Sequence, residues 1–552
     1  MEKPVIRISV RNLVEFILRN GDLESGGTAG DKEAMLKGSR LHRKIQKQMG
    51  SHYQAEVSLK KDTEYEDLIL RVEGRADGIF TQNEKICIDE IKGVYKNLEL
   101  LAEPVLVHRA QALCYAWIYL DDHGLEEIDV QMTYAHLDTE MIKRFRETMT
   151  REELESWYQR LLDSYHKWLS YQMKWREERN RSMEKLEFPF IYRKGQKEMV
   201  AGIYHAISRK EQIFIQAPTG VGKTMSAVFP AVRSIGEGKA ETLFYLTART
   251  ITRTVAQDAF EILRKNGLLF KTVTITAKEK LCFCEKPECN PETCPYAKGH
   301  YDRINDAVYE LWTKEEAFDR ETILAQAEKW QVCPFEMSLE LSVWMDAVIC
   351  DYNYVFDPNV YLKRFFGENI SGKYLFLIDE AHLLSKEKLK ILLRAGKGYP
   401  IIFSSDNEDI ISLEEMDRDA TEILENLPDI HIFHLTNRIR TNAELSSFIL
   451  NIMHIPDKKV PRYYPHIEVV CANDKREAEN LLKDYLRQGY QYFPEKEKNS
   501  HNIQRETAEV RDTERLVLIL DASYYYDEKG YLRALNSVNN EKSQVRNLFH
   551  QL

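Results

Sequence analysis

The chain has 552 residues, of which 43% are hydrophobic and 30% charged, with a net charge of −11 at pH 7, and this length predicts three or four domains rather than one hydrophobic core. It contains no run of about eighteen apolar residues and no signal-peptide core, so we expect a cytoplasmic location and no membrane partner. The acidic balance argues against a surface coated with nucleic acid, although it is compatible with a basic channel inside an acidic molecule.

Residues 1–140 contain five short polar motifs. In chain order they are Gly38-Ser-Arg-Leu-His42, Glu56, Gly74-Arg-Ala-Asp77, Asp89-Glu-Ile-Lys92 and Gln111-Ala-Leu-Cys-Tyr115. Apolar runs at 68–72 and 85–91 predict neighbouring strands, and Asp77 and Glu90 fall at the ends of these strands. Two carboxylates placed in this way can bind Mg²⁺, although each motif taken alone is also compatible with surface charge.

Three more residues extend this predicted acidic site. Lys92 shares a strand face with Glu90, because side chains alternate along a strand, and it can orient an attacking water. Gln111 and Tyr115 are about one helical turn apart, so they share a helix face that can position DNA.

The five motifs together resemble the RecB-type PD-(D/E)XK nucleases, including the CRISPR-associated RecB-like nucleases. This resemblance implies a nuclease domain that cleaves DNA with Mg²⁺. In that reading Asp77, Glu90 and Lys92 are catalytic, Asp77 and Glu90 bind the metal, and His42 is a further metal ligand.

Residues 141–187 are rich in charged and aromatic residues at helical spacing, and they contain neither glycine nor proline. The pattern predicts long amphipathic helices that join two domains. Packing against a core is favoured over a solvated linker by one apolar stripe, which consists of Trp157, Tyr158, Leu161, Leu162 and Tyr165.

A phosphate-binding loop follows an apolar strand at Ile213. The motif A-P-T-G-V-G-K-T fits the P-loop pattern, except that Ala217 replaces the first glycine. Gly220 and Gly222 let backbone N–H groups wrap the phosphates, Lys223 reaches the β- and γ-phosphates, and Thr224 offers its hydroxyl to Mg²⁺. The sequence therefore predicts an ATP site here.

Five of the nine cysteines cluster downstream of the P-loop. They are Cys282, Cys284, Cys289, Cys294 and Cys333. Clustered cysteines in a cytoplasmic chain indicate a metal site, and four thiolates suit either a [4Fe–4S] cluster or zinc. Their spacing differs from the paired C-x-x-C of zinc ribbons, which favours the cluster; buried reduced thiols are the remaining interpretation. The other cysteines, Cys87, Cys114, Cys350 and Cys471, lie in or beside apolar runs and are predicted core residues.

The apolar strand at 374–378 ends in Asp379 and Glu380, within the motif D-E-A-H. Such a Walker B strand places Asp379 on Mg²⁺ and Glu380 where it polarises the attacking water. D-E-A-H resembles the superfamily 2 helicases, and that resemblance implies that Arg193 and Gln196, upstream of the P-loop, read the adenine.

The segments Tyr245–Thr250 and Asp351–Asp357 resemble motifs of the XPD/DinG helicases. In that family an iron–sulfur domain lies between the P-loop and D-E-A-H, and it closes with a motif like Cys333-Pro-Phe335. The resemblance implies a [4Fe–4S] cluster in an insert at about 280–345. The ligands we assign are Cys282, Cys289, Cys294 and Cys333, with Cys284 as the spare thiol.

The last third departs from that family and resembles a superfamily 1 ATPase. The segment Ile401–Asp409 resembles the strand before that class's D-x-x-Q motif, but the Gln is absent. Leu435-Thr-Asn-Arg-Ile-Arg-Thr441 resembles L-x-x-N-x-R-[ST], which implies that Arg440 contacts the γ-phosphate. The sequence ends at Leu552, just before the expected position of the last arginine motif, so we expect an incomplete second motor domain; a genuine hybrid and an incomplete sequence both fit this ending.

The expected fold class is α/β, with a PD-(D/E)XK nuclease domain and RecA-like P-loop motor domains. The nuclease domain spans 1–140 and a helical linker 141–187. The first motor domain spans 188–388 and includes the iron–sulfur insert, and the incomplete second motor domain spans 389–552.

This organisation predicts an ATP-dependent DNA helicase with an attached nuclease. It would use ATP, Mg²⁺ and a [4Fe–4S] cluster to move on single-stranded or forked DNA in repair or processing. The alternative is an ATP- and DNA-binding nuclease whose truncated motor is inactive. An RNA helicase is a third interpretation, which the iron–sulfur insert and the nuclease motifs both disfavour.

Overall fold

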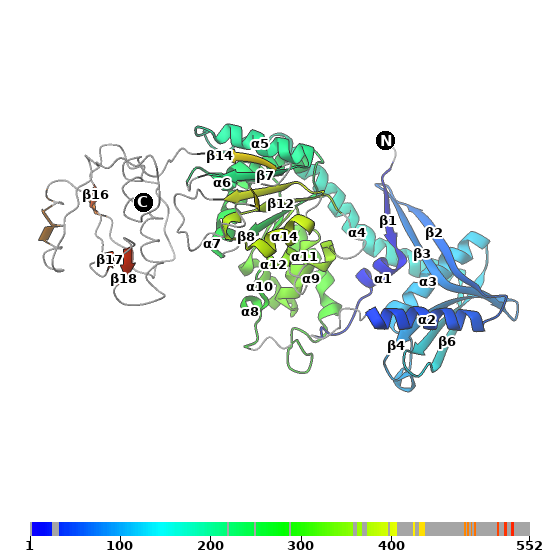
Figure 1. The fold of residues 1–552 in the computed structure, drawn as a ribbon. Helices are drawn as coiled ribbons and strands as arrows, with labels where there is room; N and C mark the ends of the chain where they lie inside the picture. Colours follow the sequence, from blue (N-terminus) through cyan, green and yellow to red (C-terminus); the bar gives the residue numbers. More distant parts are fainter. Residues whose placement is uncertain are drawn as a thin grey trace. The chain divides into compact units, whose positions relative to one another are not determined.

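The computed structural model describes most of the chain up to residue 405 and short segments beyond it (Figure 1). The described residues are 3–24, 32–217, 220–247, 250–285, 289–356, 362–366, 372–395, 398–405, 423–424, 430–435, 480–481, 483–484, 487, 491–492, 516–517, 524–526 and 532–534. The chain forms two compact units, one of Met1–Pro189 with Val232–Leu375 and the other of Phe190–Ala231 with Phe376–Leu552. In the described part of the chain, no helix combines the length and the apolar character that a membrane span requires.

The N-terminal part of the first unit is built on a mixed sheet. Its strands are β1 (Val5–Ser9), β2 (Gln54–Glu64), β3 (Ile69–Gln82), β4 (Lys85–Val94), β5 (Glu127–His136) and β6 (Ile142–Thr150), in the order β1-β3-β4-β5-β6 with β2 paired to β3. The antiparallel β3–β4 pair sets Gly78 opposite Asp89. The predicted neighbouring strands are therefore confirmed, and Asp77 and Glu90 lie on adjacent strands.

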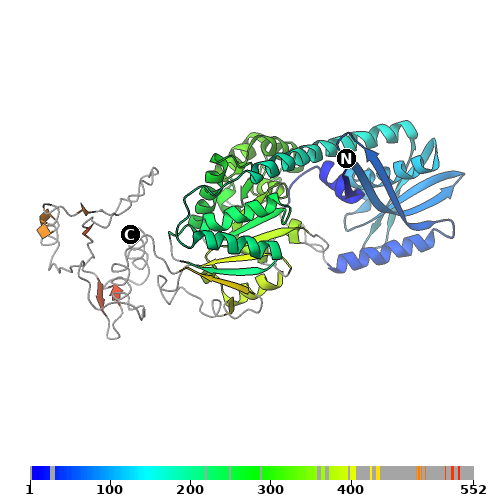
Figure 2. The same ribbon diagram turned by 90° about the horizontal axis from the view of Figure 1, so that it is seen from above.

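Helices cover both faces of this sheet (Figure 2). On one face, α1 (Val10–Ile17) and α3 (Leu106–His123) enclose a core that includes Ile88 and Tyr134. On the other face, α2 (Lys32–Gln48) packs on Ile91 and Ala135. Side chains along β4 and β5 enter the two cores alternately, because successive side chains of a strand point to opposite faces of the sheet.

The predicted helical linker begins later than expected. Residues 142–150 form β6, which pairs with β5 and alternates between exposed and half-buried side chains, so helix was the wrong prediction there. One helix, α4 (Arg151–Glu184), follows, and its N-terminus is closed by a capping box between Thr150 and Glu153. Its apolar stripe is packed as predicted: Tyr158, Leu161 and Leu162 are buried, with Trp157 and Tyr165 against the same core.

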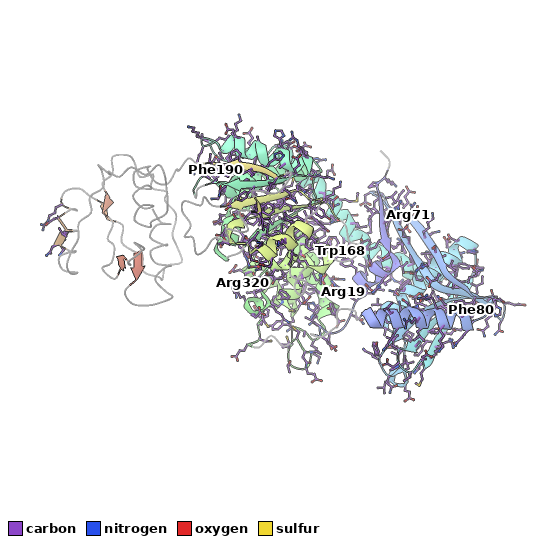
Figure 3. All side chains as sticks on the ribbon, in the orientation of Figure 1. Arg19, Arg71, Phe80, Trp168, Phe190 and Arg320 are labelled. Atoms are coloured by element: carbon purple, nitrogen blue, oxygen red, sulfur yellow. The ribbon has the colours of Figure 1, made fainter. Side chains whose placement is uncertain are left out.

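Later residues of α4 pack within the first unit on helices from the middle of the chain. Trp168, labelled in Figure 3, is buried there. Its ring centroid lies 5.0 Å from that of Phe16, 5.7 Å from that of Trp312 and 4.9 Å from that of Trp344. Aromatic contacts of this kind add to the free energy gained from burial.

The first unit also contains four parallel strands of the α/β part. Their order is β10 (Ala317–Phe318), β9 (Thr272–Thr274), β11 (Ala347–Asp351) and β8 (Thr242–Thr247), with α7 (Thr250–Lys265) joining β8 to β9. Between β9 and β11 the chain forms α8 (Lys278–Leu281), α9 (His300–Lys314), α10 (Arg320–Trp330) and α11 (Pro334–Ser342). This largely helical insert occupies the predicted range, and α12 (Asn353–Phe356) and α13 (Lys363–Phe366) follow β11.

The second unit contains most of β12 (Tyr374–Ile378), from Phe376 onward, and three further parallel strands of the same sheet. The order is β12, β13 (Ile401–Ser405), β7 (Gln212–Gln216) and β14 (Ile430–His434), with α5 (Gln196–Arg209) before β7 and α14 (Lys386–Ala395) before β13. Because β13 and β14 both pair with β7, the expected boundary at 388/389 is wrong. The sequence pattern did not reveal this, since a strand's partner depends on long-range pairing. Most residues after 405 lie outside the described part, including Arg440 and Cys471.

Candidate functional site

The P-loop lies between β7 and α6 (Lys223–Gly236), as predicted. Gly220 and Gly222 have φ angles of +83° and +81°, a region that glycine adopts without the strain of a Cβ. A Cβ on Gly222 would also lie 2.7 Å from the amide nitrogen of Gln196. Lys223 and Thr224 begin α6, so the N–H groups of its first turn face the loop and favour an anion.

Side-chain hydrogen bonds connect Gln196 and Arg193 to the P-loop backbone. Gln196 is buried; its Oε1 accepts the Arg193 N–H at 3.0 Å, and its Nε2 donates to the Val221 carbonyl at 3.2 Å. The Arg193 guanidinium donates to the Gly220 carbonyl. Gln196 therefore holds the shape of the loop, a role that sequence reasoning missed when it assigned only adenine recognition.

The Walker B strand ends at the same edge of the parallel strands as the P-loop. β13 separates β12 from β7, with Ile378 opposite Phe403 and Phe403 opposite Phe214. Carboxyl ends of parallel strands share one edge, where α/β proteins bind ligands. Asp379 follows β12, its Oδ1 accepts the Glu380 N–H at 3.1 Å, and Glu380 has a φ of +53°. Backbone strain of this kind is concentrated at functional sites.

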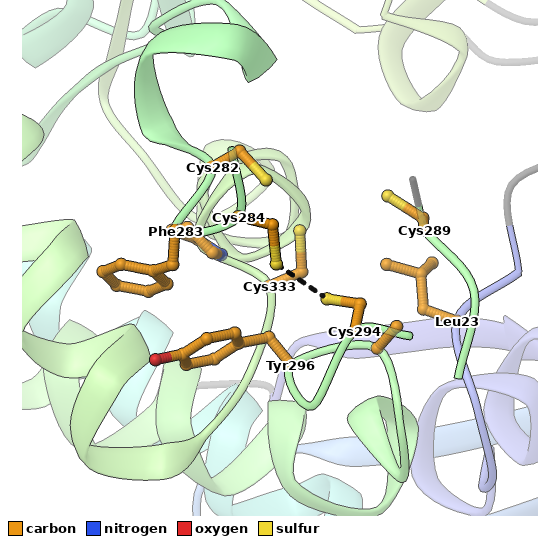
Figure 4. Close-up of a pocket in the computed structure, with 10 residues that line it drawn as sticks. Leu23, Cys282, Phe283, Cys284, Cys289, Cys294, Tyr296 and Cys333 are labelled. Atoms are coloured by element: carbon orange, nitrogen blue, oxygen red, sulfur yellow. Dashed lines mark hydrogen bonds between the residues drawn. The ribbon is translucent and has the colours of Figure 1, made fainter. Parts of the chain in front are cut away.

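All five clustered cysteines line one cavity in the insert (Figure 4). Cys289, Cys294 and Cys333 are buried, while Cys282 and Cys284 are half-buried. The Sγ atoms of Cys284 and Cys294 are 3.8 Å apart. Cys284, which we predicted to be the spare thiol, therefore lies beside the predicted ligand Cys294. This geometry makes Cys284 a possible ligand as well.

Cys333 is held at the start of α11. The helix begins with Pro334, and the Cys333 N–H donates to Nδ1 of His300 at 3.1 Å. Burial lowers the pKa of His300 to about 4, which keeps the ring neutral and able to accept this hydrogen bond. His300 directly follows the cysteine loop and was not predicted from sequence.

Burial raises the pKa of Cys333 to about 12, and burial together with the neighbouring thiols raises the pKa of Cys284 to about 11. A bound metal ion has the opposite effect on the pKa of a coordinating thiol, which it deprotonates.

Within the described residues, no three His, Cys, Asp or Glu side chains are grouped to hold a single metal ion. Four thiols are the donor set of a [4Fe–4S] cluster, and the five thiols around this cavity include enough donors to fit that group. The predicted core cysteines Cys87, Cys114 and Cys350 are buried.

The acidic motifs of the N-terminal domain also meet in space. The Asp77 Oδ2 accepts the Ile91 N–H at 2.7 Å, and its Oδ1 is 3.7 Å from Nδ1 of His42 on α2. Lys92 Nζ lies 2.9 Å from Glu90 Oε1 and donates to Gln111 Oε1 at 2.5 Å.

Glu90 is the buried centre of this acidic site. Burial, opposed by Lys92, raises its pKa to about 7. Its Oε2 is buried and accepts no hydrogen bond from the described residues. An orphaned carboxylate oxygen beside a second carboxylate fits a divalent cation, and Mg²⁺ usually takes only one or two carboxylates besides water and phosphate.

Two neighbours of this acidic site were not given a role by the sequence. Glu56 has a φ of +57°, lies between the register pairs Ala55–Gly78 and Val57–Ala76, and forms an ion pair with Arg75 at 2.6 Å. Gln46 donates to Glu56 Oε1 at 3.1 Å and to the Asp77 carbonyl at 2.9 Å. Gln46 lies one helical turn after His42, so helical spacing could have identified it.

Comparison with protein families identifies the class of the α/β part. Residues 193–288 match the DEAD/DEAH box helicase model, and residues 266–391 match the DEAD_2 model. Residues 193–391 therefore carry DEAD/DEAH box and DEAD_2 helicase domains, which include strands of the parallel sheet.

Individual relatives are distant. The regulator of telomere elongation helicase 1 homolog of Caenorhabditis briggsae is 24% identical over 247 residues, covering 37% of this chain and 24% of that protein. The Fanconi anemia group J protein homolog of Gallus gallus is 36% identical over 92 residues, 16% of this chain and 7% of that protein. The chain thus spans about a quarter or less of the length of these two curated relatives.

Among solved structures, the chain is similar to an XPD helicase, with 16% identity, a TM-score of 0.23, and 54% of this chain and 48% of that chain covered. It is also similar to the UvsW helicase of bacteriophage T4, with 14% identity, a TM-score of 0.24, and 47% and 67% covered.

Proposed function

We propose that this protein is an ATP-dependent DNA helicase with an attached Mg²⁺-dependent nuclease, acting on single-stranded or forked DNA. The observation that carries the motor part is the shared edge of β7 and β12, which brings the P-loop, Gln196 and Asp379 to one end of the parallel strands. This arrangement, together with the helicase family matches, supports ATP as the nucleotide.

Each motor residue has a distinct task in this proposal. The backbone of Gly220 and Gly222 encloses the phosphates. The Lys223 ammonium now donates to the Ala217 carbonyl at 2.8 Å, and in this proposal it donates to a phosphate oxygen instead when ATP binds. Thr224 and Asp379 would hold the Mg²⁺, and this ion would neutralise charge on the phosphates. Glu380 orients the attacking water.

The nuclease part rests on the acidic site. Asp77 and Glu90 would hold Mg²⁺, with His42 beside them, and the metal supplies charge stabilisation at the cleaved phosphate. Lys92, fixed between Glu90 and Gln111, positions the water that attacks.

The insert would hold a [4Fe–4S] cluster through four of its five clustered thiols and guide the separating strands. Bonds between the cluster and its cysteine ligands would keep the loop that carries these cysteines folded, as metal sites do in small domains. Zinc in the same thiols is the competing outcome, which metal analysis and the visible absorption spectrum separate.

DNA-stimulated ATP hydrolysis by cluster-loaded protein tests the motor. Lys223→Ala removes the phosphate contact, and Lys197→Ala, at an exposed position on α5, is the matched control. Turnover that rises with single-stranded DNA, survives Lys197→Ala and is lost in Lys223→Ala supports a working motor, and unwinding of forked DNA then follows as the next assay.

Nucleotide binding without turnover would instead support the alternative, a DNA-binding nuclease with an inactive motor. Stimulation by RNA but not by DNA would contradict the proposed substrate.

A further inference from the structure

The segment at residues 18–24, which follows α1, packs on the helical insert; we call it the N-terminal strap. Its backbone and side chains are tied to the loop that precedes α9 and to the first turn of that helix. Four hydrogen bonds make the connection: Tyr301 N–H to the Gly21 carbonyl at 2.9 Å, Leu23 N–H to the Ala297 carbonyl at 2.8 Å, Gly21 N–H to Asp302 Oδ1 at 2.8 Å and Gly299 N–H to Asp22 Oδ1 at 2.6 Å. The strap is thus part of the insert's own hydrogen-bond network.

Arg19 anchors the start of the strap (Figure 3). Its Nη1 lies 2.6 Å from Glu340 Oε1 and its Nη2 donates to Asn305 Oδ1 at 2.6 Å. Arg364 reaches the same Glu340 oxygen at 2.9 Å. The Glu340 side chain is 8% exposed, and although burial alone raises its pKa, the two guanidinium groups outweigh that effect and hold the pKa below its usual range. The carboxylate is therefore charged when it binds Arg19.

Leu23, near the end of the strap, lies in the wall of the cysteine cavity (Figure 4). It is 7% exposed and packs with Cys289, Cys294 and Cys333. Elsewhere the wall is formed by the insert itself, where the rings of Phe283 and Tyr296 lie 4.5 Å apart. Leu23 is thus the cavity residue that the N-terminal part of the chain contributes.

We propose that the N-terminal strap caps the cysteine cavity, with Leu23 excluding water from the bound cluster and Arg19 anchoring the cap. This inference rests on the proposed cluster. Solvent exposure and neighbouring side chains tune the stability and potential of such clusters, so an apolar cap has a direct chemical effect. The wall of the cluster cavity would then include a residue that precedes the nuclease motifs. The cluster in the insert would therefore depend on the N-terminal part of the first unit.

The first test compares cluster lifetimes in the full chain. Protein is loaded under anaerobic conditions, then exposed to air and an iron chelator while the visible absorbance of the cluster is followed. Leu23→Asn keeps the side-chain size but adds polarity, and we expect it to shorten the lifetime roughly tenfold, the scale of outer-shell changes at metal sites. Leu23→Met, which stays apolar, and Leu100→Asn, at a leucine that is 83% exposed, should match the unmodified protein.

The second test needs no variant. Trypsin cleaves after Arg19 only when the strap leaves the insert, so removal of the cluster should speed this cleavage roughly tenfold or more, in proportion to the population of the open state. Cleavage after Lys96, which is exposed in a loop following β4, should keep its rate and serves as the internal control. Mass spectrometry of the fragments measures both rates.

The outcomes separate this inference from the cluster itself. If the unmodified protein takes up no iron–sulfur cluster, the cluster proposal fails and the cap fails with it. If the protein loads normally but Leu23→Asn keeps the parental lifetime, or if cluster removal leaves cleavage after Arg19 unchanged, the cap alone is overturned. A Leu23→Asn variant that does not load leaves the decision to the cleavage test.

Discussion

A Cβ atom on Gly74 would lie 2.7 Å from the hydroxyl oxygen of Tyr115. These residues belong to two separate sequence motifs, one on β3 and one on α3. The glycine leaves room for the phenol ring, which packs directly against the strand that carries Asp77. The two motifs thus meet in one contact beside the acidic site.

Gly74→Ala should destabilise the N-terminal domain by about 1–3 kcal/mol, the usual cost of overpacking. Denaturant unfolding followed by tryptophan fluorescence measures this. Gly38→Ala is the matched control, because a Cβ there meets nothing within 4 Å. Tyr115→Phe in the Gly74→Ala background should restore only part of the loss, since the added Cβ would also lie 2.9 Å from a carbon of the ring; full stability of Gly74→Ala alone would contradict the packing explanation.

Asp77→Asn, Glu90→Gln and Lys92→Ala should each lower DNA cleavage by roughly a hundredfold or more, the range expected for groups that activate water or bind the metal. Cleavage should also stop when EDTA removes Mg²⁺. Lys96→Ala is the control, since Lys96 is exposed in the loop after β4. Cleavage of labelled single-stranded DNA that persists in all three variants would exclude this site as the nuclease centre.

Gln196→Ala should raise the KM for ATP about tenfold while leaving kcat at saturating ATP largely unchanged. The variant loses two hydrogen bonds that shape the P-loop, to Arg193 and Val221, each worth about 1 kcal/mol. Steady-state ATPase assays separate the two constants, and Lys197→Ala should change neither. A collapse of kcat with no change in KM would assign Gln196 to the chemical step instead.

The ion pair between Arg179 on α4 and Asp346 is almost fully buried, with side chains 7% and 5% exposed. Trp175 Nε1 and the Lys271 N–H also donate to Asp346, at 3.0 Å and 2.8 Å. Arg179→Met removes one partner of a buried pair and should cost about 3–5 kcal/mol. Thermal unfolding checks this against Arg176→Met on the exposed side of α4, which should stay close to the parent.

Lys271 predicts a pH dependence of stability. It is 1% exposed, its Nζ lies 4.2 Å above the Trp175 ring, and burial lowers its pKa to about 8, while Glu316 and Asp346 act in the opposite direction. A lysine with a lowered folded-state pKa adds stability above its unfolded pKa of about 10.4, and that stability is lost as the pH falls through about 8.

The unmodified protein should therefore gain up to about 3 kcal/mol relative to Lys271→Met as the pH rises from 8 to beyond 10. Unfolding midpoints of both proteins across this range provide the measurement. Parallel pH profiles for the two proteins would show that Lys271 does not titrate in the folded state in this way.

Local features of this protein could be predicted from the sequence because they depend on neighbouring residues. The P-loop follows from glycines and a lysine between an apolar strand and a helix, and the apolar stripe of α4 follows from helical spacing. The range of the insert was set by its cysteines and flanking strands. The same short-range logic selected Asp77, Glu90 and Lys92, whose proposed roles in cleavage stay predictions.

Tertiary structure alone decided which distant segments meet. Residues 142–150 became a strand because β5 offered a free edge, and β13 joined β7 through hydrogen bonds that no local pattern encodes. Leu23 reached the cysteine cavity, and His300 reached Cys333, only once the chain had folded. Local conformation is a property of sequence windows, whereas pairing and burial depend on long-range contacts that a single sequence does not specify.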